Sequence, residues 1–160
     1  MLKAAAVELI LSRTICPGKF IVLIAGEVGD VQAAVEAGSS RAQEALVDKF
    51  VIPNVHPDVF PAIAGNSGVS ELGALGVVET FSVASLIEAA DAAVKSANVR
   101  LVEIRLAMAL GGKAFASFTG TVADVETAAM TAAMTAGEKG LLSNKVVIPQ
   151  PRPELLKELL

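Results

Sequence analysis

Residues 73–105 read GALGVVETFSVASLIEAADAAVKSANVRLVEIR, and this stretch decides the fold. Residues 74–82 form a short apolar run with β-branched side chains, which predicts a strand. Residues 82–97 place small and apolar side chains at helical spacing, and Ser82 is a suitable N-cap for that helix. Residues 99–109 alternate in polarity, which predicts a returning strand. The stretch therefore encodes strand, helix and strand in succession.

The rest of the C-terminal half continues this order of elements. Residues 111–121 predict a turn into a strand, residues 122–140 a helix rich in Ala and Met, and residues 144–151 a strand stopped by prolines. Residues 153–160 predict a short amphipathic helix that starts near Pro153. The result is a β-α-β-β-α-β unit with a helical tail. In the alternating strand, Leu101, Glu103 and Arg105 are expected on one face and Val102, Ile104 and Leu106 on the other.

The chain repeats itself. Segment 50–60, FVIPNVHPDVF, resembles segment 146–156, VVIPQPRPELL. Identical residues recur in the same order, and their separation drifts only from 92 to 96: Lys3 and Lys95, Lys19 and Lys113, Gly26 and Gly120, Asp30 and Asp124, Pro53 and Pro149, Pro57 and Pro153. This pattern indicates two tandem copies that differ by small loop insertions.

We therefore predict an α+β fold with two tandem ferredoxin-like domains, each β-α-β-β-α-β plus a short C-terminal helix. The first repeat spans residues 1–66 and the second residues 67–160, with a Gly- and Ser-rich linker at 64–73. In this sequence the first repeat lacks its opening strand and most of its first helix. Without them, we expect the first domain to have an open sheet edge and an uncovered apolar face.

Composition limits the function classes. Of the 160 residues, 53% are hydrophobic and 19% charged, which excludes a disordered chain. The net charge of −4, with no Trp or Tyr, argues against nucleic-acid binding. No apolar run approaches the roughly 18 residues that span a bilayer, so no membrane partner is expected. The single cysteine excludes an intramolecular disulfide and fits the cytoplasm. The high apolar content favours an obligate oligomer.

Residues 73–105 resemble the opening motif of bacterial microcompartment (BMC) shell proteins. The resemblance continues through GGKAFASFTGTVADVETAAMTA, residues 111–132, and VVIPQPRP, residues 146–153. It implies a structural protein with no enzyme activity, located in a microcompartment shell in the cytoplasm. Two such domains in one chain imply a pseudo-hexameric homotrimer that contacts other shell proteins.

SRTICPGKF, residues 12–20, carries a more specific resemblance, to tandem-domain shell proteins of propanediol-utilisation compartments. These present one cysteine per chain at a central pore, where a [4Fe-4S] cluster is held. The resemblance implies that Cys16 binds this metal cluster, shared by three subunits, for electron transport to or from an encapsulated redox enzyme. One chain supplies one thiolate, whereas a three-fold axis would supply three. The expected pore lining comes from two loops: Ile15, Pro17 and Gly18, and Ala109, Leu110, Gly111 and Gly112.

The resemblance also implies contacts at the edges of the tile. Lys3 and Lys95 occupy equivalent positions and correspond to the lysine that joins neighbouring tiles. His56 and Arg152 lie in the two IP-x-x-(H/R)-P segments, which supply the facing side chain.

Three other interpretations remain open at this point. The tile could have an open pore for metabolites, with an incidental thiol. The chain could instead be a regulatory protein of ferredoxin-like fold that binds a small molecule. A catalytic Cys–His pair is disfavoured, because the equivalent of His56, the only histidine, is Arg152.

Overall fold

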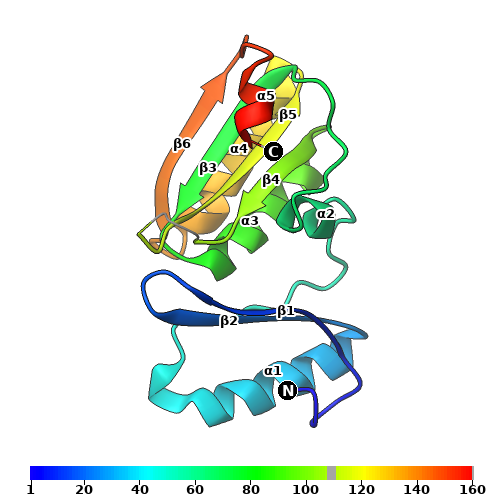
Figure 1. Cartoon of the computed structure of the whole chain (residues 1–160), viewed down its shortest axis with the longest axis vertical. Coiled ribbons are helices and arrows are strands. Elements are labelled where there is room, and N and C mark those ends of the chain that lie inside the picture. The colour runs from blue at the N-terminus through cyan, green and yellow to red at the C-terminus, as the bar shows by residue number, and fades with distance from the viewer. Residues whose placement is uncertain (108–110, 160) are drawn as a thin grey trace. The chain divides into compact units, whose positions relative to one another are not determined.

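A computed structural model describes residues 1–107 and 111–159. The chain divides into two compact units, Met1–Asn54 and Val55–Leu160, which are described separately (Figure 1). The division falls after Asn54 because the following short helix, α2 (Val59–Ile63), packs on elements of the second unit. The repeat boundary between residues 66 and 67 stays a prediction.

The second unit contains the predicted β-α-β-β-α-β order. Its elements are β3 (Ala74–Thr80), α3 (Val83–Ser96), β4 (Arg100–Arg105), β5 (Ala114–Gly120), α4 (Val122–Gly137) and β6 (Leu142–Ile148), followed by α5 (Leu155–Leu159). The strands form one sheet in the order β4-β5-β3-β6, with antiparallel neighbours. Helices α3 and α4 pack on each other and on this sheet (Figure 1). The α+β prediction is confirmed for this unit.

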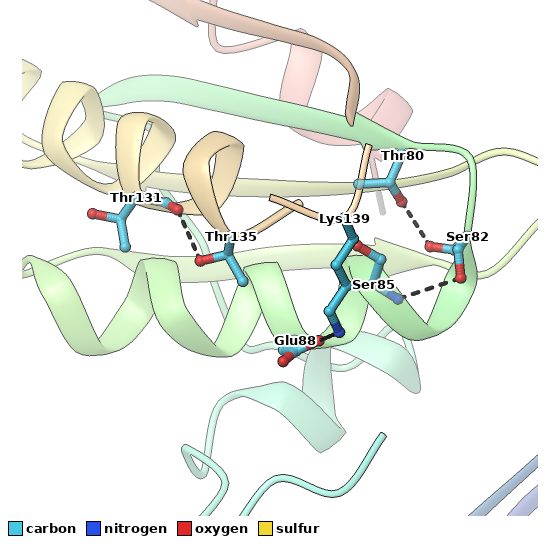
Figure 2. A network of polar contacts seen from close by, with 7 residues as sticks. All are labelled: Thr80, Ser82, Ser85, Glu88, Thr131, Thr135 and Lys139. Carbon is cyan, nitrogen blue, oxygen red and sulfur yellow. Dashed lines mark hydrogen bonds and ion pairs between the residues drawn. The ribbon is translucent and has the colours of Figure 1, made fainter. Parts of the chain in front are cut away.

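Polar contacts fix the ends of the two helices. Ser82 caps α3, since its Oγ accepts from the backbone N–H of Ser85 at 3.4 Å, as predicted. The Thr80 hydroxyl donates to the carbonyl oxygen of Ser82 at 2.7 Å and so fixes the turn from β3 into α3 (Figure 2). Beyond α4, Lys139 forms an ion pair with Glu88 of α3 (Figure 2). These contacts tie the strand, the turn and both helices together.

Small side chains allow close packing in the second unit. One face of α4 is buried and made of Val125 and alanines, whereas Met130 and Met134 are exposed on the other face. The helix that the sequence predicts to be rich in Ala and Met therefore buries its alanines, while Met130 and Met134 stay exposed. In the sheet, Gly76 lies against the buried Phe118, and a Cβ at Gly76 would clash with that ring. Only glycine permits this close approach.

The first unit is a hairpin and a helix. It comprises β1 (Glu8–Ile15), β2 (Lys19–Ala25), α1 (Val28–Ala42) and a 3-10 turn at Gln43–Ala45. Strands β1 and β2 pair antiparallel, with a register shift between Leu9 and Leu11. The β4–β5 pair has its register shift between Leu101 and Glu103, 92 residues further on. The two hairpins are therefore equivalent down to the position of the irregularity, as the repeat predicts.

Two expectations about strands are wrong. The counterpart of β6 in the first repeat, around residues 50–53, forms no strand in the described structure. β6 pairs with β3 alone, and the described first unit has no strand equivalent to β3. The second difference concerns the predicted face of Leu101, Glu103 and Arg105. Leu101 is fully buried, whereas Glu103 and Arg105 are partly exposed. The register shift between Leu101 and Glu103 interrupts the alternation of side chains at that point.

The expected uncovered apolar surface of the first unit is confirmed. Its sheet has two strands, and apolar side chains on both are exposed: Leu9, Ile10, Phe20 and Val22. The equivalents of Leu9 and Ile10 in the second unit, Leu101 and Val102, are fully buried. The first unit therefore lacks cover that the second unit has.

Candidate functional site

Cys16 lies in the tight turn of the β1–β2 hairpin. Ile15 and Lys19 are paired across the hairpin, so Cys16, Pro17 and Gly18 make up the connection between the strands. Gly18 has φ +74°, a left-handed conformation that side-chain-bearing residues rarely adopt. Ile15 is buried, whereas Cys16, Pro17 and Gly18 are exposed. The strands thus hold an accessible free thiol at the end of the hairpin.

The donor set of one chain is too small for a cluster. Among residues 1–107 and 111–159, no group of three or more His, Cys, Asp or Glu side chains could hold a metal ion. A thiolate is the usual ligand of iron in iron–sulfur clusters, which most often have four of them. The exposed Cys16 thiol fits as one ligand, and the remaining ligands must come from other molecules.

The equivalent turn of the second unit connects β4 and β5. Gly111 and Gly112 both have positive φ values, +61° and +89°, so this connection also requires glycine. The expected pore residues Ala109 and Leu110 lie outside the described residues. Because the two hairpins share their register, the Cys16 turn and the glycine turn occupy equivalent positions in the two repeats.

A polar cluster, not found from the sequence, anchors the end of the glycine turn. Oε2 of Glu79 accepts from Lys113 Nζ at 3.0 Å and from Ser143 Oγ at 2.6 Å. The hydrogen bonds from Ser143 and Lys113 lower the pKa of Glu79. The Lys113 ammonium also lies 5.8 Å from the centre of the Phe81 ring. Lys113 follows Gly112 directly, so this cluster ties the glycine turn to β3 and β6.

Two of the four predicted edge residues meet at a buried carboxylate. Oδ2 of Asp91 accepts from Lys95 Nζ at 2.6 Å, and its Oδ1 accepts from the backbone N–H of His56 at 2.7 Å. Asp91 is buried, while Lys95 is partly exposed. The His56 ring accepts, at Nδ1, from the backbone N–H of Asp58 at 3.2 Å. The sequence does not indicate the bond between Asp91 and His56, because the two residues are 35 positions apart. The spacing of four between Asp91 and Lys95 does predict an ion pair on one helix face.

The other two edge residues lie in different units, and each is described within its own unit. Lys3 is exposed in the turn before β1, within the first unit. Arg152 is exposed in the second unit, just before α5, and its carbonyl oxygen accepts from the backbone N–H of Leu155 at 3.0 Å. Both side chains are thus accessible.

Among the described residues, no helix is both long and apolar enough to cross a membrane.

Comparison with known proteins identifies the fold and the family. The BMC domain matches residues 1–55 and 74–151. The bacterial microcompartment shell protein PduT of Citrobacter freundii is 48% identical over 159 residues, which cover 99% of this chain and 86% of that protein. The crystal structure of a microcompartment protein from Desulfitobacterium hafniense DCB is 49% identical, with a TM-score of 0.90, over 98% of this chain and 87% of that one.

A more distant structure shares the tandem arrangement. The fused permuted hexameric shell protein MSM0275 from the RMM microcompartment has a TM-score of 0.63 at 26% identity, over 86% of this chain and 71% of that one. Proteins of this kind are structural and assemble with themselves and with other shell proteins. The chain therefore belongs to the BMC-domain family and is a structural protein of a bacterial microcompartment shell.

Proposed function

We propose that three copies of this chain form a tile whose central pore holds a [4Fe-4S] cluster through three Cys16 thiolates. The observation that carries the proposal is the position of the only cysteine, exposed at the end of a hairpin. A closed three-fold arrangement converts one thiol per chain into three thiols around one axis. The similarity to the shell protein PduT supports the placement of this chain in a shell tile.

In this tile the chain's own residues hold the cluster and close the pore around it. Three Cys16 thiolates would ligate three irons, and the fourth iron would take water, a small molecule or another protein. Ile15, Pro17 and Gly18 would surround the thiols, and Ala109, Leu110, Gly111 and Gly112 would line the pore between them. When bound, the cluster supplies a carrier for single electrons. The tile would then transfer electrons across the shell, to or from an encapsulated redox enzyme.

The edge of the tile would be formed by Lys3, Lys95, His56 and Arg152. Asp91 supports this role for two of them, because it fixes the Lys95 ammonium beside the backbone of His56. An ion pair that leaves the lysine partly exposed keeps its other donors available to a neighbouring tile. Other shell proteins are the expected partners at this edge.

The cluster is tested by Cys16→Ser, and Ser12→Ala, on the preceding strand β1, is the matched control. Protein purified without oxygen should contain about four irons and four sulfides per three chains, as this cluster type requires. Cys16→Ser should keep the mass of the assembly and lose the iron, the brown colour and the spin signal of the reduced protein. Ser12→Ala should keep all of these.

Two results would contradict the proposal. A Cys16→Ser assembly that retains a stoichiometric cluster would show that the ligands lie elsewhere. Wild-type protein that forms the assembly but contains no iron would leave a shell tile with an open pore for metabolites.

A further inference from the structure

Arg105 of the second unit is held by two neighbouring side chains. Its Nε donates to Oε1 of Glu103 at 2.8 Å, and its Nη2 lies 2.7 Å from the same oxygen. The guanidinium also lies 5.2 Å from the centre of the Phe115 ring, within the range of a cation–π contact. The carboxylate therefore neutralises this arginine, and the ring adds a second favourable contact.

The first unit has the same arginine without either neighbour. Arg105 corresponds to Arg13 at the repeat separation of 92, where the carboxylate position becomes Leu11. The ring position becomes Ile21 at the separation of 94. The two hairpins share the position of their register shift, so the two arginines occupy equivalent places on β1 and β4. Both groups that hold the second arginine are thus replaced by apolar side chains around the first.

The first hairpin contains no carboxylate that could neutralise Arg13. The sequence has no Asp or Glu between Glu8 and Glu27, and Lys19 adds a second cation beside the turn. The Nε of Arg13 is buried and has no hydrogen-bond partner in the part of the chain that the structure describes. A buried charged donor without an acceptor is costly. Arg13 therefore carries a full charge that no group of the hairpin balances.

This charge lies close to the only thiol. Arg13 is three residues before Cys16, and it pairs with Ile21, while the next pair on the same face, Ile15 with Lys19, closes the turn. Three residues of extended strand span about 10 Å, which is comparable to the Debye length at physiological salt. A charge at Arg13 therefore acts on the position of the thiol with little screening.

We propose that Arg13 is the counter-ion of the cluster: its unneutralised guanidinium stabilises the thiolate-bound cluster and favours the reduced state. A thiolate-ligated cluster is an anion, and reduction adds one more negative charge. In the tile, the three-fold axis would bring three of these guanidinium groups around one cluster. Arg13 acts through its charge and is not an iron ligand. The proposal rests on the cluster binding proposed above and adds the residue that sets the charge of the site.

The first experiment measures the midpoint potential of the cluster by redox titration of the spin signal of the reduced protein. Arg13→Gln removes the cation, and Leu11→Glu supplies the carboxylate that Glu103 provides in the second repeat. Both variants should shift the potential to more negative values, because the reduced cluster loses its counter-ion. Both should also lose iron to a chelator several-fold faster than the wild type.

Two control variants separate this effect from a general change of the protein. Arg13→Lys keeps the charge at the same position, so its potential should match that of the wild type. Arg41→Gln removes an exposed cation from the last turn of α1, in the same unit but away from the turn in sequence, and should also match the wild type.

A second measurement separates a role of charge from a role in folding. In assemblies from which the iron has been removed, the three guanidinium groups repel one another, so Arg13→Gln should resist urea at least as well as the wild type. With the cluster bound, the order should reverse, and Arg13→Gln should release its iron first. Lower stability of Arg13→Gln in both forms would mark Arg13 as a structural residue and overturn the proposal.

Failure of this proposal is distinguishable from failure of the proposed function. If Arg13→Gln and Leu11→Glu bind the cluster with the potential of the wild type, the role of Arg13 is overturned and the cluster site stands. If the wild-type assembly contains no iron, the proposed function is overturned, and the role of Arg13 with it.

Discussion

The backbone N–H of His56 donates to Oδ1 of Asp91 at 2.7 Å, while Oδ2 of the same carboxylate holds Lys95 at 2.6 Å. A single buried side chain on α3 therefore links a helix to a segment 35 residues earlier in the chain. Both oxygens are used, which satisfies the carboxylate in its buried position. Asp91 is thus the residue on which the local geometry of two predicted edge residues depends.

Replacement of Asp91 by Ala should destabilise the second unit by about 1–3 kcal/mol, because it leaves a part-buried N–H and an ammonium without their acceptor. The partly exposed lysine keeps the effect below that of a fully buried pair. Urea unfolding measures the change. Asp91→Asn should retain part of the stability, since the amide oxygen can still accept from His56.

The matched control for this prediction is Glu126→Ala, which removes an exposed carboxylate from α4. Its stability should stay within about 0.5 kcal/mol of the wild type. Equal effects of Asp91→Ala and Glu126→Ala would show that the carboxylate between Lys95 and His56 contributes nothing specific.

Glu79 should make the stability of the second unit sensitive to acid. Hydrogen bonds from Ser143 and Lys113 lower its pKa in the folded protein below the ordinary value of 4.5. A carboxylate with a lowered pKa contributes stability above its unfolded pKa, and that contribution is lost as the pH falls through the folded pKa. Wild-type stability should therefore decline below about pH 4.5, and Glu79→Gln should remove this part of the decline.

The size of the Glu79 effect at neutral pH should be about 1 kcal/mol, because both hydrogen bonds involve a charged but part-exposed group. Urea midpoints measured from pH 7 to pH 3 provide the test, with Glu71→Gln in the exposed linker as the control. The urea midpoint of Glu71→Gln should follow that of the wild type over the whole pH range. If the urea midpoint of Glu79→Gln also falls in parallel with that of the wild type, the Ser143 and Lys113 contacts do not stabilise the ionised form of Glu79.

Much of the second unit was predictable from residues 73–105 and the segments that follow. Local signals sufficed there: helical spacing, a serine cap at Ser82 and alternation along the strands. The register shift at Leu101 was not predictable, because it depends on pairing with Phe118 of another strand. The same holds for Asp91 and Glu79, whose partners are 34 to 64 residues away in sequence, apart from Lys95.

The first unit shows the limit of reasoning by repeat. Residues 50–53 match the β6 segment in sequence, yet they form no strand. A strand needs a neighbour for its backbone hydrogen bonds, and β6 obtains them from β3. Residues 50–53 therefore share the side-chain pattern of β6, but the described first unit offers them no strand equivalent to β3 with which to pair.

The contact between Gly76 and Phe118 predicts a steric effect in the sheet. Gly76→Ala would place a Cβ well inside the van der Waals distance of the Phe118 ring, which is fully buried and cannot move freely. Overpacking of this kind costs about 1–3 kcal/mol. Gly137→Ala, at the end of α4 with open space around it, is the control and should be neutral or slightly stabilising.

The double variant Gly76→Ala with Phe118→Leu separates a clash from a loss of backbone freedom. If the clash dominates, the smaller leucine side chain should relieve it, and the two changes should be less destabilising together than their sum. Urea unfolding of the wild type, the two single variants and the double variant measures the coupling. Strict additivity would mean that the ring is not the cause.

Gly18 should determine how well the first hairpin holds Cys16 in place. Its φ of +74° costs a residue with a Cβ about 1–2 kcal/mol, although nothing lies within 4 Å of the position where that Cβ would stand. Gly18→Ala should therefore destabilise the first unit by backbone strain alone. Gly18→Asn should be milder, since asparagine tolerates the left-handed region better than alanine. Hydrogen exchange of the β1–β2 amides reports the difference within this unit, with Gly29→Ala in α1, also in open space, as the control. If these amides are equally protected in Gly18→Ala and Gly18→Asn, the left-handed conformation is not what limits the turn.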